Sequence, residues 1–403
     1  MPTDFASLLR FARENVTPLL VYQIFVSVFV LYSLVNAAGD WFAFRRPGEW
    51  SGAPATTQSL SVLIPARNEE AVIAACVESL RSQEYSGTLE ILVLDDRSDD
   101  ATGRIISEIA ATDPRVRLIG GGELLPGWKG KPNALRQLSA VATGDVLLLT
   151  DADCVFYPGA LRRAVSLRVE TGADVLSLMP YLGCGSFWEH VVIPLQYMLV
   201  FATLPVRNVY ASPNPAFAAA NGAFILLPAT TYAELGGHEP VKSEMAEDIR
   251  FAQNVKRQGR KLVYGDGSTT YGVRMYSGFR EVWDGFSKNV FSAMGNSVPV
   301  VTVWSLFLLL TQVFPFLFLG TALASGNRAP AVFWFPLAHV GVALCIRLAL
   351  TFRFRQAWWA VLTHPVGWLI VIAIAWNSAY LAISGKGHAW KGRVYTPEVA
   401  PRG

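Results

Sequence analysis

Four long, predominantly apolar stretches of the chain contain no Asp, Glu, Lys or Arg. They cover residues 15–39, 289–327, 329–346 and 356–385. A helix needs about 20 predominantly apolar residues to cross a bilayer. Each stretch can therefore hold one membrane-spanning helix, provided that the third helix continues past Arg347. We expect a membrane protein with one span before, and three spans after, a large segment that carries most of the charge.

The charged segment, residues 40–288, is predicted to be a globular domain. It follows residues 1–39, which hold the first span and, before it, either an interfacial helix or an ordinary lead-in turn. It precedes the spans of residues 289–385 and a tail of residues 386–403. Charged residues make up 16% of the chain, below the roughly 25% of soluble domains. The net charge of +3 gives no electrostatic case for a nucleic-acid partner, and nothing in the sequence indicates the oligomeric state.

Short runs of Val, Ile and Leu alternate with helical segments in the charged segment. The predicted strands are 60–66, 89–96, 116–120, 146–153 and 174–180, and the predicted helices are 68–83, 100–111, 131–142 and 158–171. This alternation is typical of an α/β fold with a mainly parallel sheet covered on both faces. The apolar run 191–206 is too short for a span and contains two prolines, so it is expected in the core or at the membrane surface.

The stretch 147-LLLTDADCVF-156 ends a buried strand with two aspartates, Asp151 and Asp153. Ligands of such sheets bind beyond the carboxyl ends of the strands. Two carboxylates at that place can share one hard cation, and Mg²⁺ or Mn²⁺ prefers oxygen ligands. An isolated pair of this kind is more often a surface turn, but its position after a buried strand favours a metal site.

The stretch 93-VLDDRSDDAT-102 ends the preceding strand in the same way. Ser98 or Asp99 can cap the next helix. Capping does not explain Asp96, which should face the ligand crevice, where a carboxylate can accept an N–H group of a base such as uracil.

Two further segments carry candidate residues. In 126-PGWKGKPNA-134, Lys129 and Lys131 lie among glycines and can approach a diphosphate, although the segment is not a GxxxxGK[ST] loop. In 244-EMAEDIR-250, Glu247 and Asp248 lie at a predicted helix start. The helix dipole accounts for one acid there, so the second is a candidate for chemistry.

Taken together, IPARNEE, VLDDRSDDAT, TDAD, NGAFIL, GGH and AEDIRFAQNVKRQG resemble the family 2 glycosyltransferases of the GT-A fold, in order and spacing. The segments RMYSGFREVWDGFSKN, HPVGW and WKGRVY are similar to the membrane-bound branch with bacterial carotenoid-acid glycosyltransferases and ceramide glucosyltransferases. The resemblance covers nearly the whole chain. It implies a Rossmann-like, mainly parallel catalytic domain of the GT-A type.

The resemblance also implies roles for individual residues. Asp248 would be the catalytic base, and Asp153, with Asp151, would hold Mg²⁺ or Mn²⁺. The nucleotide-sugar site would be lined by Pro65, Ala66, Glu69, Asp96, Lys131, Asn133, Asp151 and Glu247. The QxxRW motif of processive and ceramide enzymes is absent, so Lys288 or Arg274 would serve the diphosphate instead.

These features predict an inverting transfer of a hexose, with glucose as the family expectation, from a UDP-sugar to a lipid acceptor. A carboxylic acid is already ionised at neutral pH, so the pair Glu247 and Asp248 favours a hydroxyl acceptor such as ceramide, diacylglycerol or a terpenoid. The alternatives are a polyprenyl-phosphate sugar transferase and a carotenoid carboxylate glycosyltransferase. The rival classes are a membrane transporter with a nucleotide-sensing domain and an oxidoreductase, which the missing GxGxxG disfavours. A bacterial cell membrane is the expected location, with the domain facing the cytoplasm, where UDP-sugars are found.

Overall fold

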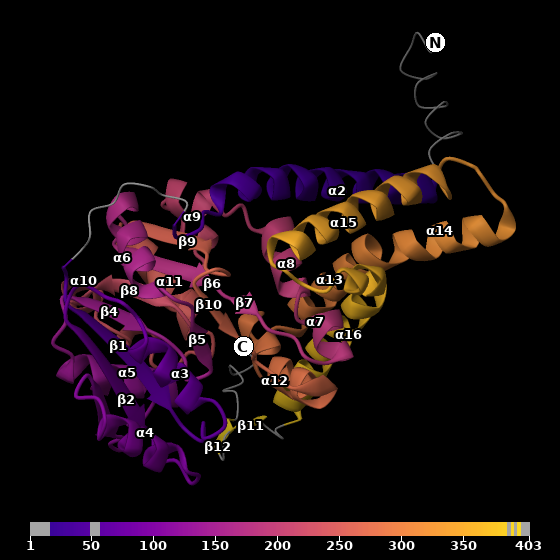
Figure 1. The fold of residues 1–403 in the computed structure, drawn as a ribbon. Helices are drawn as coiled ribbons and strands as arrows, with labels where there is room; N and C mark the ends of the chain where they lie inside the picture. Colours follow the sequence, from indigo (N-terminus) through magenta and orange to yellow (C-terminus); the bar gives the residue numbers. More distant parts are fainter. Residues whose placement is uncertain (1–16, 49–56, 385–387, 391–392, 396–403) are drawn as a thin grey trace. The chain divides into compact units, whose positions relative to one another are not determined.

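The computed structural model describes residues 17–48, 57–384, 388–390 and 393–395 (Figure 1). The predicted interfacial helix before the first span lies outside these residues. The chain forms two compact units, which are described separately. The helical unit comprises Met1–Gly39, Ser186–Leu204 and Val282–Tyr380, and the sheet unit comprises Asp40–Gly185, Pro205–Glu281 and Leu381–Gly403. The single continuous domain predicted over residues 40–288 remains a prediction.

The core of the sheet unit is a seven-stranded sheet in the order β3-β2-β1-β4-β8-β6-β9. The strands are β1 (Leu60–Ala66), β2 (Leu89–Asp95), β3 (Val116–Gly120), β4 (Val146–Leu149), β6 (Val175–Met179), β8 (Ile225–Pro228) and β9 (Leu262–Asp266). Neighbours run parallel, except that β8 is antiparallel to both β4 and β6. The predicted mainly parallel α/β fold is confirmed. The near-continuous apolar strands are buried along most of their length, as expected for a sheet covered on both faces.

Helices connect these strands, and the first four follow the order that the sequence predicts. They are α3 (Ile73–Arg81), α4 (Thr102–Ala110), α5 (Gly130–Val141), α6 (Ala160–Thr171), α9 (Arg207–Ala211), α10 (Ala229–Glu234) and α11 (Glu247–Arg257), with two 3₁₀ turns at Pro215–Phe217 and Glu239–Val241. A small sheet has the order β5 (Cys154–Phe156), β10 (Tyr271–Val273), β7 (Tyr181–Leu182), and β11 (His388–Trp390) pairs with β12 (Arg393–Tyr395).

Two predicted elements are shorter in the structure. The helix predicted over 68–83 begins only at Ile73, because Asn68 has a positive φ of 52° and the next residues form a loop. The strand predicted over 146–153 ends at Leu149, and a turn at Ala152 and Asp153 leads into β5. Both corrections lengthen the loops at the carboxyl ends of strands.

Four helices of the described chain are long and apolar enough to cross a membrane: Pro18–Ala43, Val298–Ser325, Trp334–Arg353 and Trp358–Ile383. They comprise α2 (Pro18–Ala43), α13 (Val298–Leu308) with a π-helical turn and α14 (Phe314–Ser325), α15 (Trp334–Arg353), and a 3₁₀ turn with α16 (His364–Ile383). The predicted arrangement of one span before the domain and three after it is confirmed. The helical unit also contains α7 (Phe187–Val192), α8 (Leu195–Thr203) and most of α12 (Gly278–Ala293), and α8 is far too short to be a span.

Candidate active site

The carboxyl ends of three neighbouring parallel strands carry the candidate acidic residues. Ala66 pairs with Asp95 at the ends of β1 and β2, and Leu63 pairs with Leu149 at the end of β4. Asp96 follows β2 directly, and Asp151 lies two residues beyond β4. Their grouping at one edge of the sheet therefore follows from the strand register, as the sequence predicts.

The loop after β4 is fixed to the neighbouring strands by its first residue. The backbone N–H of Thr150 donates to the carbonyl of Leu63 at 3.1 Å, and its hydroxyl donates to the carbonyl of Ala223 at 2.8 Å. The two aspartates that follow are partly exposed, in contrast to the buried strand before them. These two hydrogen bonds of Thr150 therefore hold the loop that carries the carboxylates of Asp151 and Asp153 against the sheet.

Lys131, in the first turn of α5, joins acids from two other elements. Its Nζ atom lies 2.7 Å from Oδ1 of Asp151 and 3.1 Å from Oε1 of Glu247, and it donates to the carbonyl of Gly222 at 3.3 Å. Burial alone would lower the pKa of Lys131, but the carboxylates of Asp151 and Glu247 outweigh burial and raise it. Lys131 is therefore a permanent cation, and the structure brings it together with two of the predicted site residues.

Asp248 begins α11 beside Glu247. Its Oδ2 atom accepts the N–H of Gly222 at 3.1 Å, and its Oδ1 atom accepts the N–H of Ile249 at 2.8 Å. Burial and the adjacent Glu247 carboxylate raise the pKa of Asp248 to about 6, against the opposing effects of Lys131 and these two amides. A carboxylate with this pKa is ionised at neutral pH but accepts a proton more readily than an ordinary aspartate.

The residues predicted for the nucleotide lie on β1 and in the loop after it, directly after β2, and on α5. The buried Asp96 donates its N–H to the carbonyl of Ala66 at 2.8 Å, and Pro65 is partly exposed. The N–H of Glu69 donates to the hydroxyl of Thr102 at 2.8 Å. Asn133 is buried, and its amide donates to the carbonyl of Glu123 at 3.2 Å. The nucleotide roles of these residues stay predictions.

Lys288, predicted to serve the diphosphate, lies on α12 in the helical unit. Arg274 belongs to the sheet unit, is exposed, and has its side chain against Gly185. Lys288 and Arg274 therefore belong to different units. Their role also stays a prediction.

The donor set of Asp151 and Asp153 fits a divalent cation of the Mg²⁺ or Mn²⁺ type. Both residues offer hard carboxylate oxygens, and the Asp151 side chain is 36% exposed, which leaves room for water and phosphate oxygens. In the described part of the chain no group of three or more His, Cys, Asp or Glu residues could hold a metal by itself. An ion bound here would complete its coordination with solvent and substrate, as Mg²⁺ commonly does.

The structure adds two residues that the sequence reasoning did not assign. Gly222 contacts both Asp248 and Lys131 through its backbone, and the NGAFIL motif was the available signal. Tyr276 is buried, and burial, with a smaller contribution from the charge of Asp153, raises its pKa to about 12. Tyr276 lies in the segment RMYSGF, from which the sequence predicts no role for this tyrosine.

A mainly parallel α/β sheet with acids and a lysine grouped beyond its carboxyl edge is typical of the GT-A fold. Residues 61–202 match the family model described as Glycosyl transferase family 2. Residues 61–202 therefore carry a family 2 glycosyltransferase domain, and the resemblance found in the sequence is confirmed for this part of the chain.

Two curated relatives are 4,4'-diaponeurosporenoate glycosyltransferases. The protein of Staphylococcus haemolyticus is 27% identical over 261 residues, which are 64% of this chain and 66% of the relative. That of Staphylococcus aureus strain USA300 is 26% identical over 251 residues, 60% of this chain and 64% of the relative. The chain thus spans just under two thirds of the length of these relatives.

Among solved structures, the mannosyltransferase PcManGT from Pyrobaculum calidifontis, in complex with GDP-Man and Mn²⁺, has a similar fold. The TM-score is 0.54 at 17% identity, and the match covers 90% of this chain and 99% of the other. At this identity the likeness supports the GT-A fold and does not extend to the substrate.

Proposed function

We propose that the protein is an inverting hexosyltransferase that moves a hexose, with glucose as the first candidate, from a UDP-sugar to the hydroxyl group of a membrane lipid. The acceptor classes are ceramide, diacylglycerol and terpenoid alcohols. The observation that carries the proposal is the cluster of Lys131, Asp151, Glu247 and Asp248, in which one carboxyl group has a pKa of about 6. Such a cluster can both hold an anionic leaving group and accept a proton.

Asp248 is the proposed base. An alcohol stays protonated at neutral pH, so its attack on the anomeric carbon needs an acceptor for the proton. The raised pKa of Asp248 suits that task, and the two backbone N–H groups fix the orientation of its carboxylate. The acceptor oxygen forms the new bond to the anomeric carbon, the bond to the UDP oxygen breaks, and the proton goes to Asp248.

Lys131 is the proposed counter-charge for the leaving diphosphate. Its ammonium group is held by Asp151 and Glu247, so its position is fixed before the donor binds. Asp153 and Asp151 would hold Mg²⁺ or Mn²⁺, which would supply further positive charge to the diphosphate. The Mn²⁺ in the complex of the P. calidifontis mannosyltransferase supports this choice of ion.

Asp96 is the proposed partner of the uracil base. It is buried next to Ala66, at the strand end beside Pro65. A carboxylate in this position can accept the N–H of uracil, with Asn133 and Glu69 completing the site. The GDP-Man of the fold relative makes GDP-mannose the donor to compare.

A second candidate is transfer to a carotenoid carboxylate. The names of the relatives from Staphylococcus support it, since 4,4'-diaponeurosporenoate is a carboxylic acid. Such an acceptor is ionised at neutral pH and needs no base. A polyprenyl phosphate acceptor would likewise be ionised, so the dependence on Asp248 separates the lipid alcohol from both alternatives.

The deciding experiment uses purified full-length protein, Mn²⁺ and radiolabelled UDP-glucose or GDP-mannose. A lipid alcohol, a carotenoid carboxylic acid and a polyprenyl phosphate are the acceptors. We expect transfer from UDP-glucose to the alcohol, its loss in Asp153→Ala, and a decrease of about 10²–10⁴-fold in Asp248→Asn. Glu108→Gln, which removes an exposed carboxylate on α4, is the matched control. Undiminished transfer to the alcohol by Asp248→Asn would refute the proposed base.

The proposed location is a bacterial cell membrane with the sheet unit in the cytoplasm. Four helices are apolar enough to span a bilayer, the curated relatives are bacterial, and UDP-sugars are cytosolic. The substrate lipid would then be taken from the cytoplasmic leaflet.

A further inference from the structure

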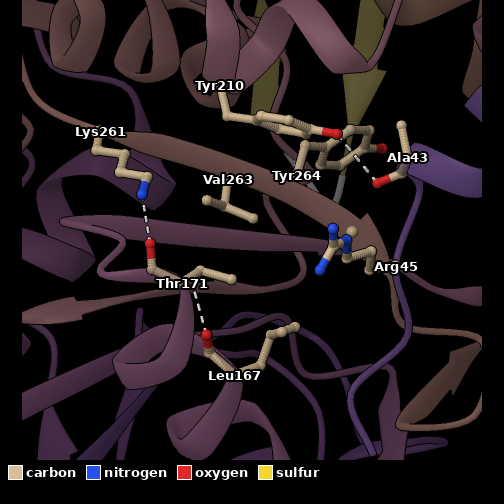
Figure 2. Close-up of a pocket in the computed structure, with 9 residues that line it drawn as sticks. Ala43, Arg45, Leu167, Thr171, Tyr210, Lys261, Val263 and Tyr264 are labelled. Atoms are coloured by element: carbon tan, nitrogen blue, oxygen red, sulfur yellow. Dashed lines mark hydrogen bonds between the residues drawn. The ribbon is translucent and has the colours of Figure 1, made fainter. Parts of the chain in front are cut away.

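A cavity of about 200 Å³ lies in the sheet unit beside β9, the edge strand of the large sheet. None of the residues that line it belongs to the candidate active site. Val263 and Gly265 of β9 form one wall, and the end of α6 with the segment that follows α2 forms others (Figure 2). The cavity is too small for a nucleotide sugar, since pockets for drug-sized ligands measure about 300–1,000 Å³.

The charged side chains of the cavity are cationic, and its other polar side chains are the hydroxyl-bearing Thr171, Tyr210 and Tyr264. Figure 2 shows Lys261 and Arg45 on opposite sides of Val263, with the rings of Tyr210 and Tyr264 above it. None of the nine described lining residues is acidic. One of the three donors of the Lys261 ammonium group is used by the carbonyl of Thr171. The lining therefore favours a ligand with negative charge and several acceptor oxygens.

The end of the first candidate span contributes to the lining of the cavity. Ala43, which lines it, is the last residue of the first candidate span, and Arg45 follows two residues later. The hydroxyl of Tyr210 donates to the carbonyl of Ala43 at 3.4 Å. Basic residues directly after a span attract anionic lipids, and tyrosines are enriched at the level of the headgroups.

We propose that this cavity binds the phosphate group of an anionic membrane lipid between Arg45 and Lys261. Binding there would tie the segment after α2 more firmly to β9. In that segment, the carbonyl of Arg45 already accepts the N–H of Asp266 at 2.8 Å. The ring of Phe44 packs against the ring of Tyr264, with 5.4 Å between the ring centroids. The proposal is independent of the sugar donor and of the acceptor.

The test compares full-length protein in nanodiscs of phosphatidylcholine alone with nanodiscs that also contain phosphatidylglycerol. We expect phosphatidylglycerol to raise the thermal unfolding midpoint of the wild type, because a ligand of the folded state stabilises it. The double variant Arg45→Gln/Lys261→Gln should lose most of this gain. In detergent, the dissociation constant of the double variant for short-chain phosphatidylglycerol should be at least about tenfold higher than that of the wild type. Arg162→Gln, which removes an exposed charge from α6, should keep the full gain.

A second variant separates the cavity from general surface charge. Val263→Phe fills the space and leaves both cations in place, so it should also lose the gain from phosphatidylglycerol. An equal gain in Val263→Phe, or in the double charge variant, would overturn the proposal. The proposal would also fail if inorganic phosphate stabilised the protein saturably and phosphatidylglycerol gave no further stabilisation. The ligand would then be a free anion.

Discussion

Asp248 determines the expected pH dependence at the scale of single residues. Its pKa of about 6 means that the carboxylate form, which accepts a proton, is lost as the pH falls through 6. We expect kcat/KM for a lipid alcohol to fall about tenfold per pH unit below this value. The acidic limb should be absent from the residual activity of Asp248→Asn. A pH–rate profile with unchanged activity down to pH 5 would contradict the prediction.

The raised pKa of Asp248 also makes the stability of the folded protein depend on pH. Between the ordinary aspartate pKa of 3.8 and about 6, the folded protein holds a proton that the unfolded chain has released. Stability therefore falls as the pH rises through this range. Asp248→Asn should accordingly be more stable than the wild type at pH 7, by roughly 1–3 kcal/mol, and should lose this advantage below pH 4. Thermal unfolding at the two pH values measures it.

Gly222 offers a test of how the cluster is positioned. A Cβ atom at this position would lie 2.8 Å from Nζ of Lys131 and 3.4 Å from Cβ of Asp248. Because two carboxylates hold the lysine in place, we expect Gly222→Ala to displace it and to reduce kcat/KM by roughly 10–100-fold. The unfolding free energy should change by no more than about 1–2 kcal/mol. Gly120→Ala, where a Cβ meets nothing within 4 Å, is the control, and equal activity of the two variants would contradict the prediction.

At the scale of elements, the chain after α2 covers the edge of the large sheet at β9. Arg46 pairs with the fully buried Asp266 at 2.8 Å. Without Arg46, the buried carboxylate of Asp266 loses a hydrogen-bond donor and a positive charge. Arg46→Met should therefore lower the unfolding free energy by about 1–3 kcal/mol. A double-mutant cycle with Asp266→Asn should give a coupling of about 1–2 kcal/mol. The exposed pair Arg104 and Glu108 on α4 should give only about 0.3–0.5 kcal/mol. Equal couplings would show that the buried pair does not fix this segment.

The buried strands could be predicted from the sequence because their signal is local. The strands β1 and β3 coincide with the predicted ranges 60–66 and 116–120, since each is a continuous apolar run between polar segments. The antiparallel insertion of β8 between β4 and β6 could not be predicted in this way. Its place depends on pairing with residues about 50–80 positions earlier in the chain.

The loops that form the site depend on contacts between distant residues. The late start of α3 follows from hydrogen bonds of Asn68 and Glu69 to Ser98 and Thr102, about 30 residues further on. The predicted cap of α4 by Ser98 or Asp99 is wrong. Asp100 accepts the N–H of Thr102 instead. The acids Asp151 and Asp248 were identified correctly as lying at element ends, but the lysine that joins Asp151 to Glu247 required the structure.

At the scale of the whole molecule, crossings by Val298–Ser325 and Trp334–Arg353 would return the chain to the side of the membrane on which the sheet unit lies. Charge bias supports this topology in part. Arg353 and Arg355, after α15, would lie on the domain side, and Arg328, between α14 and α15, on the outside. A further crossing by α16 would put Arg393 outside, against this charge bias and against the grouping of Leu381–Gly403 with the sheet unit.

A pair of single cysteines tests this topology in a background of Cys184→Ser and Cys345→Ser, since the other two cysteines are buried. Asn327→Cys, between α14 and α15, should react with a membrane-impermeant maleimide in intact cells. Gln356→Cys, between α15 and α16, should react only after permeabilisation, because chain connectivity puts it on the side of the sheet unit, where a cytosolic UDP-sugar must bind. Labelling of Gln356→Cys in intact cells would mean that Val298–Ser325 or Trp334–Arg353 does not cross the membrane, or that the sheet unit faces outwards. In the second case a cytosolic sugar donor could not reach Lys131 and Asp248, and the proposed function would fail with the topology.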